Sequence, residues 1–421
     1  MEKVKIGLLG LGVVGSELVN IALNSKDSLK KNYGIELEIG KIFVRDPSKK
    51  RGVNIDAAAL TTDPDEVVND PDTDIICECV GGAGTELTYE YVMKAIRNKK
   101  SVVMSSKKAL AFYGPEILCA ANQNGVVLKY DATVGGGIPI AKILENCHNG
   151  EQVVRISGIV NATSNFIYTK MFKDNNTFDE ALKKAQQNGY AENDPSEDIR
   201  SFDALYKAVI LSMFGFGKHF DHSRVRTTPY SKIDLSDMKF ANELGYTIKP
   251  VINIEDHGDK LLYNIGPCLI KNDDIIANTF SNFNIISITS SHSGKMSFYG
   301  QGAGDRPTAS AMFDDVVNII TGKRIYKQPA VSEWKEVCER KNNQYIRVRA
   351  HDTIGKLNKI TNILSEKSIN IEKILQKDKI GDRYDIIFFT SSVENNIVDD
   401  LQERFKEIEV ELISMIPFVE D

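Results

Sequence analysis

The sequence predicts a three-part α/β chain: a parallel sheet wound on both faces by helices, then an α+β region, then a small βαββαβ domain. Three observations lead to this prediction. Short apolar strands alternate with helical patterns over the first 130 residues, strands follow one another over residues 150–300, and a strand–helix–strand–strand–helix–strand order follows residue 344. The 421 residues, 42% hydrophobic and 26% charged, suffice for two or three domains with separate cores.

The first 130 residues have the pattern of a doubly wound parallel sheet. Parallel strands need crossover connections, and the alternation of strand and helix supplies them. The expected strands are residues 5–10, 39–46, 74–81, 101–105 and 126–132, and the expected helices are residues 16–23, 88–98 and 114–125. We expect residues 303–325 to complete this domain, 1–130.

The rest of the chain is expected to form an α+β domain and a small C-terminal domain. Residues 153–160, 259–270 and 282–289 have strand patterns, and helical patterns occur near 178–188 and 200–214. Strands without helical crossovers favour an antiparallel sheet covered by helices on one face. A polar stretch without a clear strand pattern suits a linker. The predicted boundaries are 131–323 for the second domain, 324–344 for the linker and 345–421 for the last domain.

Composition and charge exclude several classes of partner. A net charge of −6 gives no broad basic field, so nucleic acid is not expected and a small molecule is. The six cysteines include no CxxC pair and indicate buried thiols in a reducing compartment. The N-terminus lacks the layout of a signal peptide, and no segment reaches the ~20 apolar residues of a membrane span. We therefore expect a cytoplasmic protein without a membrane segment.

A glycine-rich turn follows the first strand. Gly10, Gly12 and Gly15 have G-x-G-x-x-G spacing and lead directly into a helix. Glycine lets the chain turn tightly beside a pyrophosphate, and the helix N-terminus offers N–H groups and a positive dipole end. The position of the motif between strand and helix predicts dinucleotide binding.

The end of the second strand bears on the choice of dinucleotide. It carries Arg45 and Asp46, and Lys49, Lys50 and Arg51 follow closely. An aspartate here would bind a ribose 2′-hydroxyl and favour NAD, whereas neighbouring cations suit a 2′-phosphate. The pattern favours NADP, while Asp46 leaves NAD open and a solvated basic loop is the alternative.

Two further strand ends and one loop carry candidate ligand contacts. ECVGGAG (78–84) and VVMSSKKAL (102–110) end predicted strands, where ligands gather in open α/β sheets. Lys107 and Lys108 are adjacent, so on a regular element only one points into the crevice. That lysine would position a cofactor amide or polarise a carbonyl, or else lie on the surface. The loop FYGQGAGDRPTASA (298–311) is either a phosphate or ribose contact or an ordinary turn.

The stretch GYAENDPSEDIRSFDALYK (189–207) concentrates charge before a helix. Gly189 suits a helix stop, and Asp198 or Ser201 would cap the next helix. Asp203 and Lys207 are i and i+4 neighbours, as in a surface ion pair. Their flanks are mostly apolar, which favours burial and hence a functional site. Local sequence leaves both interpretations open.

Several motifs together resemble the homoserine dehydrogenase family. Residues 185–207 follow its signature, with Ser201 where the family usually has glycine, and DATVGGGIPI (131–140), GIVNATSNF (158–166) and GQGAGDRPTASA (300–311) are similar to further family motifs. The resemblance covers roughly residues 4–322. It implies NAD(P)-dependent interconversion of L-homoserine and L-aspartate 4-semialdehyde, a step of threonine, methionine and isoleucine biosynthesis.

The resemblance also implies roles for individual residues. Lys207 would give or take the proton at the reacting oxygen, and Lys107 would contact cofactor and substrate. Glu192 and Asp203 would bind the substrate, and Asp198 is counted with them although it would also suit the helix start or Lys207. The implied cofactor contacts are Gly10, Gly12, Val13, Val14, Gly15, Arg45, Gly81, Ser105, Lys107, Gly189 and Gly302.

A monovalent-cation site, for Na⁺ or a similar ion, is implied as well. In the family it uses a glutamate side chain and backbone carbonyls. The counterparts are Asp131, Val134, Gly136 and Ile138. Asp131 is shorter than the glutamate, which weakens this expectation.

The tail resembles an ACT domain, a dimerising amino-acid sensor. Residues 345–377 carry its pattern, with Ile354 where proline is usual. The resemblance implies threonine as effector and a homodimer or homotetramer. No aspartate kinase portion precedes the first strand, so a monofunctional enzyme is expected.

Departures from the family motifs leave alternatives open. Met104-Ser105-Ser106-Lys107 replaces the usual T-A-N-K, and Ala162 replaces glycine. A divergent member would reduce another amino-acid-derived carbonyl, and a catalytically silent protein would only sense NAD(P) and an amino acid. A silent protein has no need of Lys107, Glu192, Asp203 and Lys207 together, which favours an enzyme.

Overall fold

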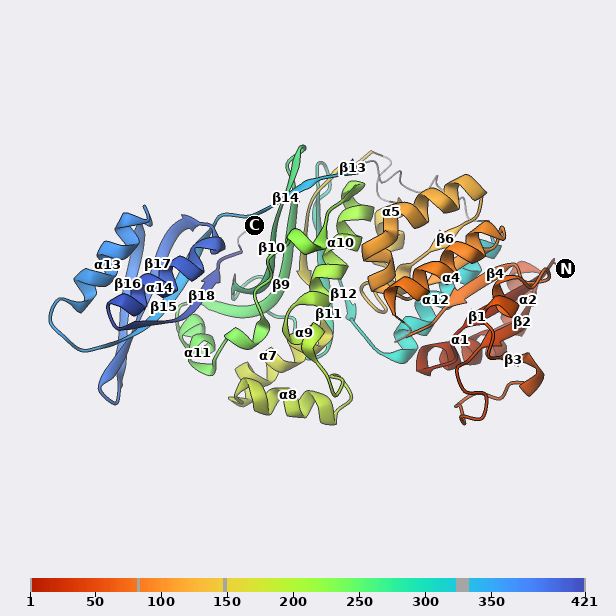
Figure 1. The fold of residues 1–421 in the computed structure, drawn as a ribbon, viewed down its shortest axis with the longest axis horizontal. Helices are drawn as coiled ribbons and strands as arrows, with labels where there is room; N and C mark the ends of the chain where they lie inside the picture. The colour runs from red at the N-terminus through yellow and green to blue at the C-terminus, as the bar shows by residue number, and fades with distance from the viewer. Residues whose placement is uncertain (1, 82–83, 147–149, 323–332, 420–421) are drawn as a thin grey trace. The chain divides into compact units, whose positions relative to one another are not determined.

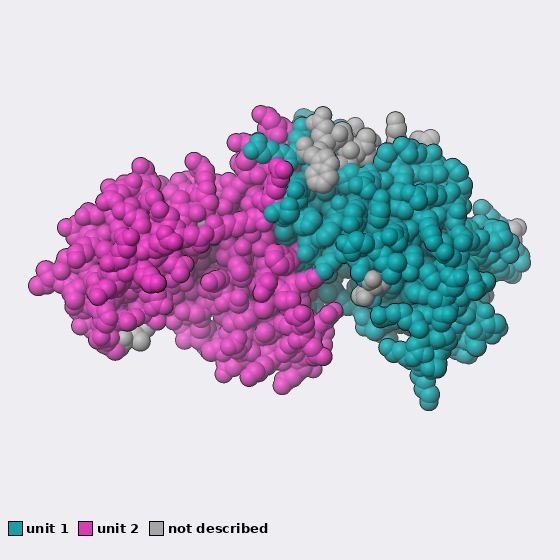
Figure 2. Space-filling view, viewed as in Figure 1, with its two compact units in different colours: residues 1–156, 203–223, 282–336 teal, residues 157–202, 224–281, 337–421 magenta. Residues whose placement is uncertain are grey.

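The computed structural model describes residues 2–81, 84–146, 150–322 and 333–419 (Figure 1). The chain divides into two compact units, coloured separately in Figure 2. Unit 1 comprises Met1–Ile156, Asp203–Ser223 and Asn282–Glu336, and unit 2 comprises Ser157–Phe202, Arg224–Ser281 and Val337–Asp421. No helix within the described ranges is long and apolar enough to cross a membrane.

Unit 1 contains the predicted parallel sheet. Its six strands lie in the order β3-β2-β1-β4-β5-β6, and every neighbouring pair is parallel (Figure 1). This order reverses direction beside β1, as in dinucleotide-binding folds. The expectation of a doubly wound α/β domain is confirmed. The strands are β1 (Glu2–Leu9), β2 (Ile35–Phe43), β3 (Leu60–Thr61), β4 (Ile75–Glu78), β5 (Ser101–Met104) and β6 (Leu128–Lys129).

Helices that are far apart in the sequence cover this sheet. Leu18 and Val19 of the first helix share one buried cluster with Ala309 and Met312, far along the sequence, and with strand residues such as Ile6. The segment after residue 304 therefore packs on the sheet with the first helix. The helices are α1 (Val13–Asn24), α2 (Lys26–Tyr33), α3 (Asp65–Val68), α4 (Thr85–Arg97), α5 (Lys107–Asn124) and α12 (Asp305–Ile320).

Helix α5 begins at Lys107, seven residues before the expected start at 114. The expected helix began with Gly114 and Pro115, but Pro115 lies inside the helix. Proline has no N–H, so the carbonyl of Ala111 loses its usual partner four residues on. The ring Nε2 of His219 lies 2.8 Å from this oxygen and replaces the missing donor. A long-range contact thus lets the helix continue through Pro115.

The remaining elements of unit 1 include a helix that carries much of the candidate site. These elements are α6 (Ile140–Asn146), α10 (Phe202–Phe216), the antiparallel hairpin β11 (Phe283–Ser290) and β12 (Gly294–Gln301), and the parallel pair β8 (Lys218–His219) and β13 (Glu333–Trp334). Residues 333–344, expected to lack strands, form β13, β14 (Glu336–Glu339) and the start of β15, because pairing with distant strands outweighs their polar composition. Residues 323–332 lie outside the described part.

Unit 2 combines helices with a long antiparallel hairpin. The hairpin pairs β9 (Tyr246–Asp256) with β10 (Lys260–Lys271). Strand β7 (Val153–Ile159) begins in unit 1 and ends in unit 2. Side chains define helix starts here: Asn161 accepts from the Ser164 N–H, and Thr177 forms a capping box with Glu180. The helices are α7 (Ala162–Asp174), α8 (Phe178–Gln187), α9 (Ser196–Ile199) and α11 (Leu235–Glu243).

The predicted βαββαβ domain forms a four-stranded antiparallel sheet in the order β16-β17-β15-β18. Side chains alternate between its faces. Ile346 and Phe388 pack under the two helices, whereas Tyr345 and Ile387 face a second cluster with residues such as Tyr230. The elements are β15 (Asn342–His351), α13 (Lys356–Glu366), β16 (Ile371–Ile380), β17 (Arg383–Val393), α14 (Val398–Glu407) and β18 (Val410–Pro417).

Candidate active site

A buried carboxylate joins two lysines in unit 1. Lys107 Nζ lies 2.7 Å from Asp203 Oδ1, and Lys207 Nζ lies 2.8 Å from Asp203 Oδ2. The Asp203 side chain is 4% exposed, against 36% for Lys107 and 11% for Lys207. The interpretation of Asp203 and Lys207 as a surface ion pair is therefore wrong. Both belong to α10, a helix that is buried along most of its length.

Burial and charge act in opposite directions on Asp203. Burial by itself would raise the pKa of the Asp203 carboxyl, but the ammonium groups of Lys107 and Lys207 outweigh it and hold that pKa well below its usual range. The carboxylate is ionised at neutral pH and keeps two cations in one place. Such a cluster can hold, donate and take back a proton beside a bound substrate.

Lys107 reaches the cluster because α5 starts at the end of β5. Lys107 is the first residue of α5, after the N-cap Ser106. The neighbouring Lys108 has its Nζ 5.7 Å from the ring centre of Tyr206. The two adjacent lysines therefore have different surroundings, as the helical geometry requires, and Lys107 is the one paired with Asp203.

Glu78, at the end of β4, was not identified from the sequence. Its buried carboxylate accepts N–H groups from Val80 (2.8 Å), Ser105 (3.1 Å) and Ser106 (2.9 Å). Burial raises the pKa of Glu78, and these three hydrogen bonds oppose the shift. Glu78 thereby ties the carboxyl ends of β4 and β5 together and fixes the backbone that leads to Lys107. A carboxylate inside the apolar run IICECV was the available signal.

The three glycines of the first turn differ in the space that a side chain would find there. A Cβ on Gly10 would lie 2.5 Å from the Cys79 carbonyl oxygen, and one on Gly15 would lie 2.5 Å from the Gly10 oxygen. A Cβ on Gly12 would meet nothing within 4 Å. Gly12 is the N-cap of α1, whose start has no side-chain cap. Open space in front of uncapped N–H groups fits a pyrophosphate.

Neighbouring cofactor candidates lie around this turn. Val13 and Val14 open α1, and Val13 is 66% exposed, which is unusual for valine. Ser105 donates its hydroxyl to the Glu78 carbonyl, and a Cβ on Gly81 would meet nothing within 4 Å. These positions fit a dinucleotide that approaches the carboxyl edge of the sheet.

The loop after β2 carries several cations, and its aspartate, Asp46, forms hydrogen bonds within the loop. Asp46 Oδ1 accepts both the N–H (2.9 Å) and the hydroxyl (2.6 Å) of Ser48. These hydrogen bonds lower the pKa of Asp46. Arg51 donates to the carbonyls of Leu11, Lys49 and Asp46 and so ties the loop to the glycine turn. Arg45 is exposed.

Three further candidates for substrate and cofactor contacts, Gly189, Glu192 and Asp198, belong to unit 2. Glu192 is exposed, and Gly189 follows α8 with a φ of +74°, which favours glycine. Asp198 Oδ1 accepts an N–H of the Asn161 side chain at 2.7 Å, so it supports the start of α7. That Asp198 or Ser201 caps α10 stays a prediction.

The surroundings of Ser201 explain how serine can replace the glycine that is usual in the family. It is fully buried and has a φ of +67°, a conformation in which glycine is usual. Its hydroxyl donates to the Thr228 carbonyl at 2.7 Å. The hydrogen bond offsets part of the strain that a side chain brings to this position.

Asp131, the only side-chain ligand expected for the cation, lies beside an ammonium group. Asp131 Oδ1 accepts the Ala141 N–H at 3.0 Å, and Lys142 Nζ lies 3.4 Å from Asp131 Oδ2 and 3.3 Å from Asp315 Oδ1. Burial raises the pKa of Asp131 to about 6 and that of Asp315 to about 7, against the opposing charge of Lys142. With Lys142 against this carboxylate pair, the arrangement does not fit a monovalent cation ligated by Asp131.

Gly136 and Gly302 are explained by close packing of the chain. A Cβ on Gly136 would lie 2.7 Å from the Gly302 carbonyl carbon, and one on Gly302 would collide with the Asn284 side chain. Val134 and Ile138 are buried beside them. Two glycine motifs that looked like ligand loops thus fit against each other.

Fold and site together define a class of protein. A parallel sheet with an open glycine turn is typical of dinucleotide binding, and a buried cluster of one carboxylate and two lysines includes Lys107, just after the carboxyl end of a neighbouring strand. This is the arrangement of a nicotinamide-dependent oxidoreductase, here with an additional βαββαβ domain.

The chain belongs to the homoserine dehydrogenase family, whose members are NAD(P)-dependent oxidoreductases. Residues 139–317 match the homoserine dehydrogenase family, residues 10–131 its NAD binding domain, and residues 344–410 the ACT domain. The homoserine dehydrogenase of Bacillus subtilis (strain 168) is 34% identical over 419 residues, which cover 97% of this chain and 96% of that protein. That of Neisseria gonorrhoeae is 35% identical, with 94% of each covered.

Solved structures show the same fold. A homoserine dehydrogenase from Thiobacillus denitrificans has a TM-score of 0.88 and 33% identity, and the match covers 100% of this chain and 99% of that one. A hyperthermophilic archaeal homoserine dehydrogenase in complex with NADPH has a TM-score of 0.61 and 26% identity, covering 76% of this chain and 99% of that one. The three-part fold class expected from the sequence is confirmed.

Proposed function

We propose that this chain interconverts L-homoserine and L-aspartate 4-semialdehyde, with reduction of the semialdehyde as the biosynthetic direction. The observation that carries the proposal is the buried cluster of Lys107, Asp203 and Lys207 in a chain whose relatives are homoserine dehydrogenases. The intact cluster favours an enzyme over a silent sensor.

The nicotinamide, when bound, supplies or accepts the hydride. As the aldehyde carbon becomes tetrahedral, its oxygen gains negative charge and needs a proton. Lys207 gives that proton from Nζ, and Lys107 stabilises the charge as the second cation. Asp203 keeps both ammonium groups in place, and the amine of Lys207 is reprotonated from water. In the reverse direction Lys207 takes the hydroxyl proton.

Substrate recognition is assigned to residues of the 189–207 stretch. Glu192 binds the substrate ammonium, and Asp198 supports this region through the Asn161 side chain. Gly189 and Gly302 remain predicted cofactor contacts by resemblance. We expect Glu192→Gln to raise KM for homoserine more than it lowers kcat, because its contact is the same in ground and transition states.

NADP is the proposed cofactor. Arg45, Lys49 and Lys50 are exposed cations at the end of β2, while Asp46 is engaged with Ser48. Cations suit the 2′-phosphate, and an engaged carboxylate is less available to a 2′-hydroxyl. The archaeal relative crystallised with NADPH agrees with this preference.

The domain boundaries and the assembly complete the proposal. We propose a nucleotide-binding domain at 1–130 completed by 303–325, a catalytic domain at 131–323, a linker at 324–344 and an ACT domain at 345–421. The ACT match supports amino-acid binding, and we propose threonine as the effector that lowers activity. A cytoplasmic homodimer or homotetramer is proposed from the same resemblance.

One assay tests the function. Purified protein is given aspartate 4-semialdehyde with NADPH or NADH, and oxidation of the cofactor is followed by absorbance. We expect turnover with NADPH, and a loss of about 10²–10⁴-fold in kcat/KM for Lys207→Ala or Lys107→Ala. Lys183→Ala, an exposed lysine of α8, is the matched control and keeps the rate. No turnover with either cofactor would reject the enzyme, and turnover only with other carbonyls would reject homoserine as its product.

A further inference from the structure

Glu78 carries a buried charge that no cation of the described chain balances. Its side chain is completely buried at the carboxyl end of β4. Within the part of the chain that the structure describes, none of the ion pairs includes this carboxylate. Its hydrogen-bond partners are the N–H groups of Val80, Ser105 and Ser106. Because burying a carboxylate without a cation is costly, Glu78 needs an explanation beyond packing.

The surroundings of Glu78 favour its ionised form. Each of its three hydrogen bonds comes from a donor, and a protonated carboxyl would add an O–H that itself needs an acceptor. Burial raises the pKa of Glu78, and the three N–H groups lower it. The donors on both oxygens therefore hold a negative charge at this place.

Glu78 lies between two segments that are expected to hold the nicotinamide end of the cofactor. Strand β4 lies beside β1, where the strand order reverses and ligands of doubly wound sheets bind. One oxygen of Glu78 accepts the N–H next to Gly81, and the other accepts the N–H next to Lys107, and both residues are predicted cofactor contacts. The hydride passes to the carbon whose oxygen Lys207 protonates, so the nicotinamide ring lies beside the lysine cluster.

The lysine cluster leaves one positive charge beside that ring. Lys107 and Lys207 carry two ammonium groups, and Asp203 carries one carboxylate. The oxidised nicotinamide ring is a cation, whereas the reduced ring is neutral. The positive charge of the cluster therefore disfavours the oxidised cofactor, and the carboxylate of Glu78 offsets this effect.

We propose that Glu78 is a positioning residue for the nicotinamide end of the cofactor. Its hydrogen bonds hold the backbone next to Gly81 and Lys107, and its charge favours the oxidised, cationic cofactor over the reduced one. The inference rests on the proposed function, since it concerns the cofactor of the same reaction. Positive charge develops on the nicotinamide as the hydride leaves, so the carboxylate also lowers the barrier for reduction of the semialdehyde.

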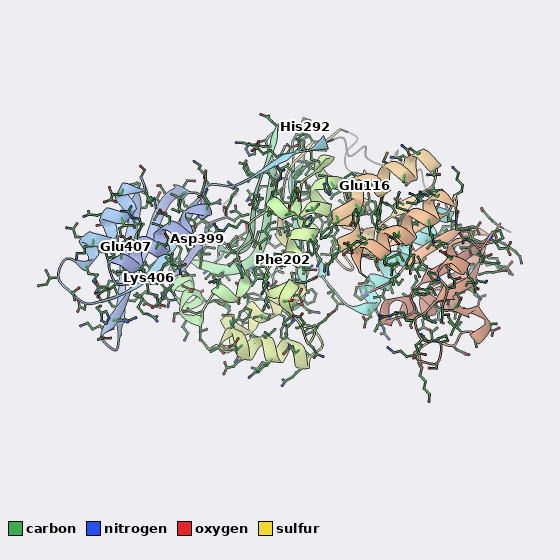
Figure 3. All side chains as sticks on the ribbon, viewed as in Figure 1. Glu116, Phe202, His292, Asp399, Lys406 and Glu407 are labelled. Atoms are coloured by element: carbon green, nitrogen blue, oxygen red, sulfur yellow. The ribbon has the colours of Figure 1, made fainter. Side chains whose placement is uncertain are left out.

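Two substitutions separate the charge of Glu78 from its reach. Glu78→Gln keeps the size of the side chain and removes the charge. Glu78→Asp keeps the charge but is one methylene shorter, so its carboxylate no longer reaches all three N–H groups. The control is Glu116→Gln on the exposed side of α5, where Glu116 accepts the Tyr89 hydroxyl at 2.8 Å (Figure 3).

Cofactor binding gives the first readout and needs no turnover. The dissociation constants of NADP⁺ and NADPH are measured by calorimetry on the full chain. We expect Glu78→Gln to weaken the binding of NADP⁺ relative to that of NADPH by about tenfold, because it removes a unit charge from a buried place. Glu78→Asp and Glu116→Gln should keep the wild-type ratio of the two constants. Thermal melting confirms that each variant is folded.

Initial rates with the semialdehyde give the second readout. We expect both Glu78 variants to lower kcat by about 10²-fold, because the backbone that leads to Lys107 is no longer held in place. KM for the semialdehyde should stay close to the wild-type value, since Glu192 still binds the substrate. A residue that only stabilised the fold would lower the melting temperature without changing the ratio of dissociation constants and without separating kcat from KM.

The outcomes separate this inference from the proposed function. An unchanged ratio in Glu78→Gln, or an equal change in Glu78→Gln and Glu78→Asp, would overturn the effect of the charge. If Glu78→Gln does not fold, Glu78→Asp decides, because a changed ratio there contradicts the charge and an unchanged ratio supports it. Wild-type kcat in both variants would overturn the positioning role. Absence of turnover in the wild type would reject the enzyme, while a ratio that responds to Glu78→Gln would leave the inference in place.

Discussion

Asp203 holds two lysines at once, and this determines what each of them can do. Without the carboxylate, two ammonium groups face each other in a mostly buried place, and one of them gives up its proton more readily. Because reduction needs a protonated Lys207, activity would then be lost at lower pH than in the wild type. The carboxylate is thus as important for the working pH range as the lysines are for the proton.

We predict that Asp203→Asn lowers kcat/KM by about 10²-fold or more and moves the alkaline limb of the pH–rate profile to lower pH.

Asp203→Asn should also lower the free energy of unfolding at pH 7 by about 2–3 kcal/mol. This is less than the ~3–5 kcal/mol of a fully buried pair, because Lys107 is partly exposed. The folded pKa of Asp203 lies below the unfolded value of about 3.9, so this stabilisation is present at neutral pH and is lost below about pH 4.

An ion pair of the same spacing on α7 is the control. Lys170 and Asp174 are i and i+4 neighbours at 2.9 Å, with side chains 31% and 39% exposed. Asp174→Asn should leave both the free energy of unfolding and the pH–rate profile almost unchanged, because exposed i, i+4 ion pairs contribute little. Equal effects of the two substitutions would contradict the role given to burial.

The ammonium group of Lys142, rather than a metal ion, pairs with the carboxylates of Asp131 and Asp315. We predict that replacing NaCl and KCl by tetramethylammonium chloride leaves the wild-type rate unchanged. Lys142→Met removes the ammonium from two buried carboxylates, and such an unpaired charge is costly. The variant should be less stable, and its melting temperature should rise with Na⁺ or K⁺ but not with tetramethylammonium. A wild-type enzyme that requires Na⁺ or K⁺ would contradict this account.

At the scale of elements, α5 shows why local sequence was insufficient. The helix continues through Pro115 only because His219, far along the chain, contacts the freed Ala111 carbonyl. Burial lowers the pKa of His219, so the ring stays neutral and carries its proton on Nε2 toward that oxygen. The contact therefore supports the helix whose first residue is Lys107.

We predict that His219→Ala lowers the free energy of unfolding by about 1–3 kcal/mol, the cost of leaving a buried carbonyl without a partner. In the Pro115→Ala background residue 115 regains its N–H and can donate to the Ala111 carbonyl. The same substitution should then cost less, and denaturant titrations of the four proteins give the coupling energy. If His219→Ala lowers the free energy of unfolding equally in both backgrounds, His219 does not act through its hydrogen bond to the Ala111 carbonyl.

Much of the element order was predictable because strand and helix periods are local. Five of the six strands of the first sheet and the whole βαββαβ order follow from such patterns, whereas the two-residue strand β3 was not predicted. Contacts between distant residues were not predictable: the early start of α5, the strand β13 and the hydrogen bonds of Glu78 each depend on a partner remote in sequence. For the site, resemblance singled out Lys107 and Asp203, and only the structure shows that one carboxylate joins both lysines.

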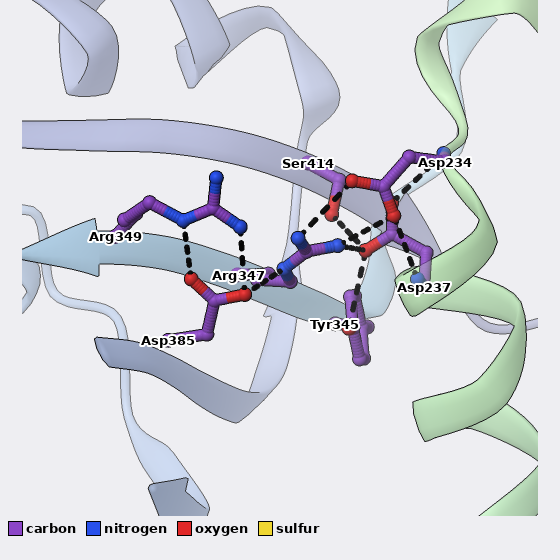
Figure 4. Close-up of polar contacts among 7 residues, drawn as sticks. All are labelled: Asp234, Asp237, Tyr345, Arg347, Arg349, Asp385 and Ser414. Atoms are coloured by element: carbon purple, nitrogen blue, oxygen red, sulfur yellow. Dashed lines mark hydrogen bonds and ion pairs between the residues drawn. The ribbon is translucent and has the colours of Figure 1, made fainter. Parts of the chain in front are cut away.

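At the scale of the whole molecule, a buried arginine attaches the βαββαβ domain to the rest of unit 2 (Figure 4). Arg347 of β15 is completely buried and contacts Asp234 (2.8 Å), Asp237 (2.9 Å) and Asp385 (2.9 Å). Asp234 and Asp237 form the capping box of α11. One guanidinium thus joins a strand of the small domain to the start of a helix outside it.

The other groups of this cluster compensate the charge only in part. Tyr345 and Ser414 donate their hydroxyls to Asp237, and Arg349 donates to Asp385. Burial raises the pKa of Asp237, whereas Arg347 outweighs burial at Asp234 and lowers its pKa. Without Arg347, the buried carboxylate of Asp237 would keep only the two hydroxyls and the Asp234 N–H as hydrogen-bond partners.

We therefore predict that Arg347→Met lowers the free energy of unfolding at pH 8 by about 3–5 kcal/mol, the cost of breaking a buried ion pair. A carboxyl whose folded pKa lies above its unfolded value takes up a proton on folding, so stability increases as pH falls through the folded pKa. The variant should regain stability between pH 8 and pH 5.5, and Asp237→Asn added to it should remove that gain.

Arg349→Met is the control, since it breaks a contact whose arginine is 26% exposed. It should lower the free energy of unfolding by about 1 kcal/mol. Denaturant titrations at both pH values decide, and equal losses for the two arginines would show that Arg347 does not attach the domain through this cluster.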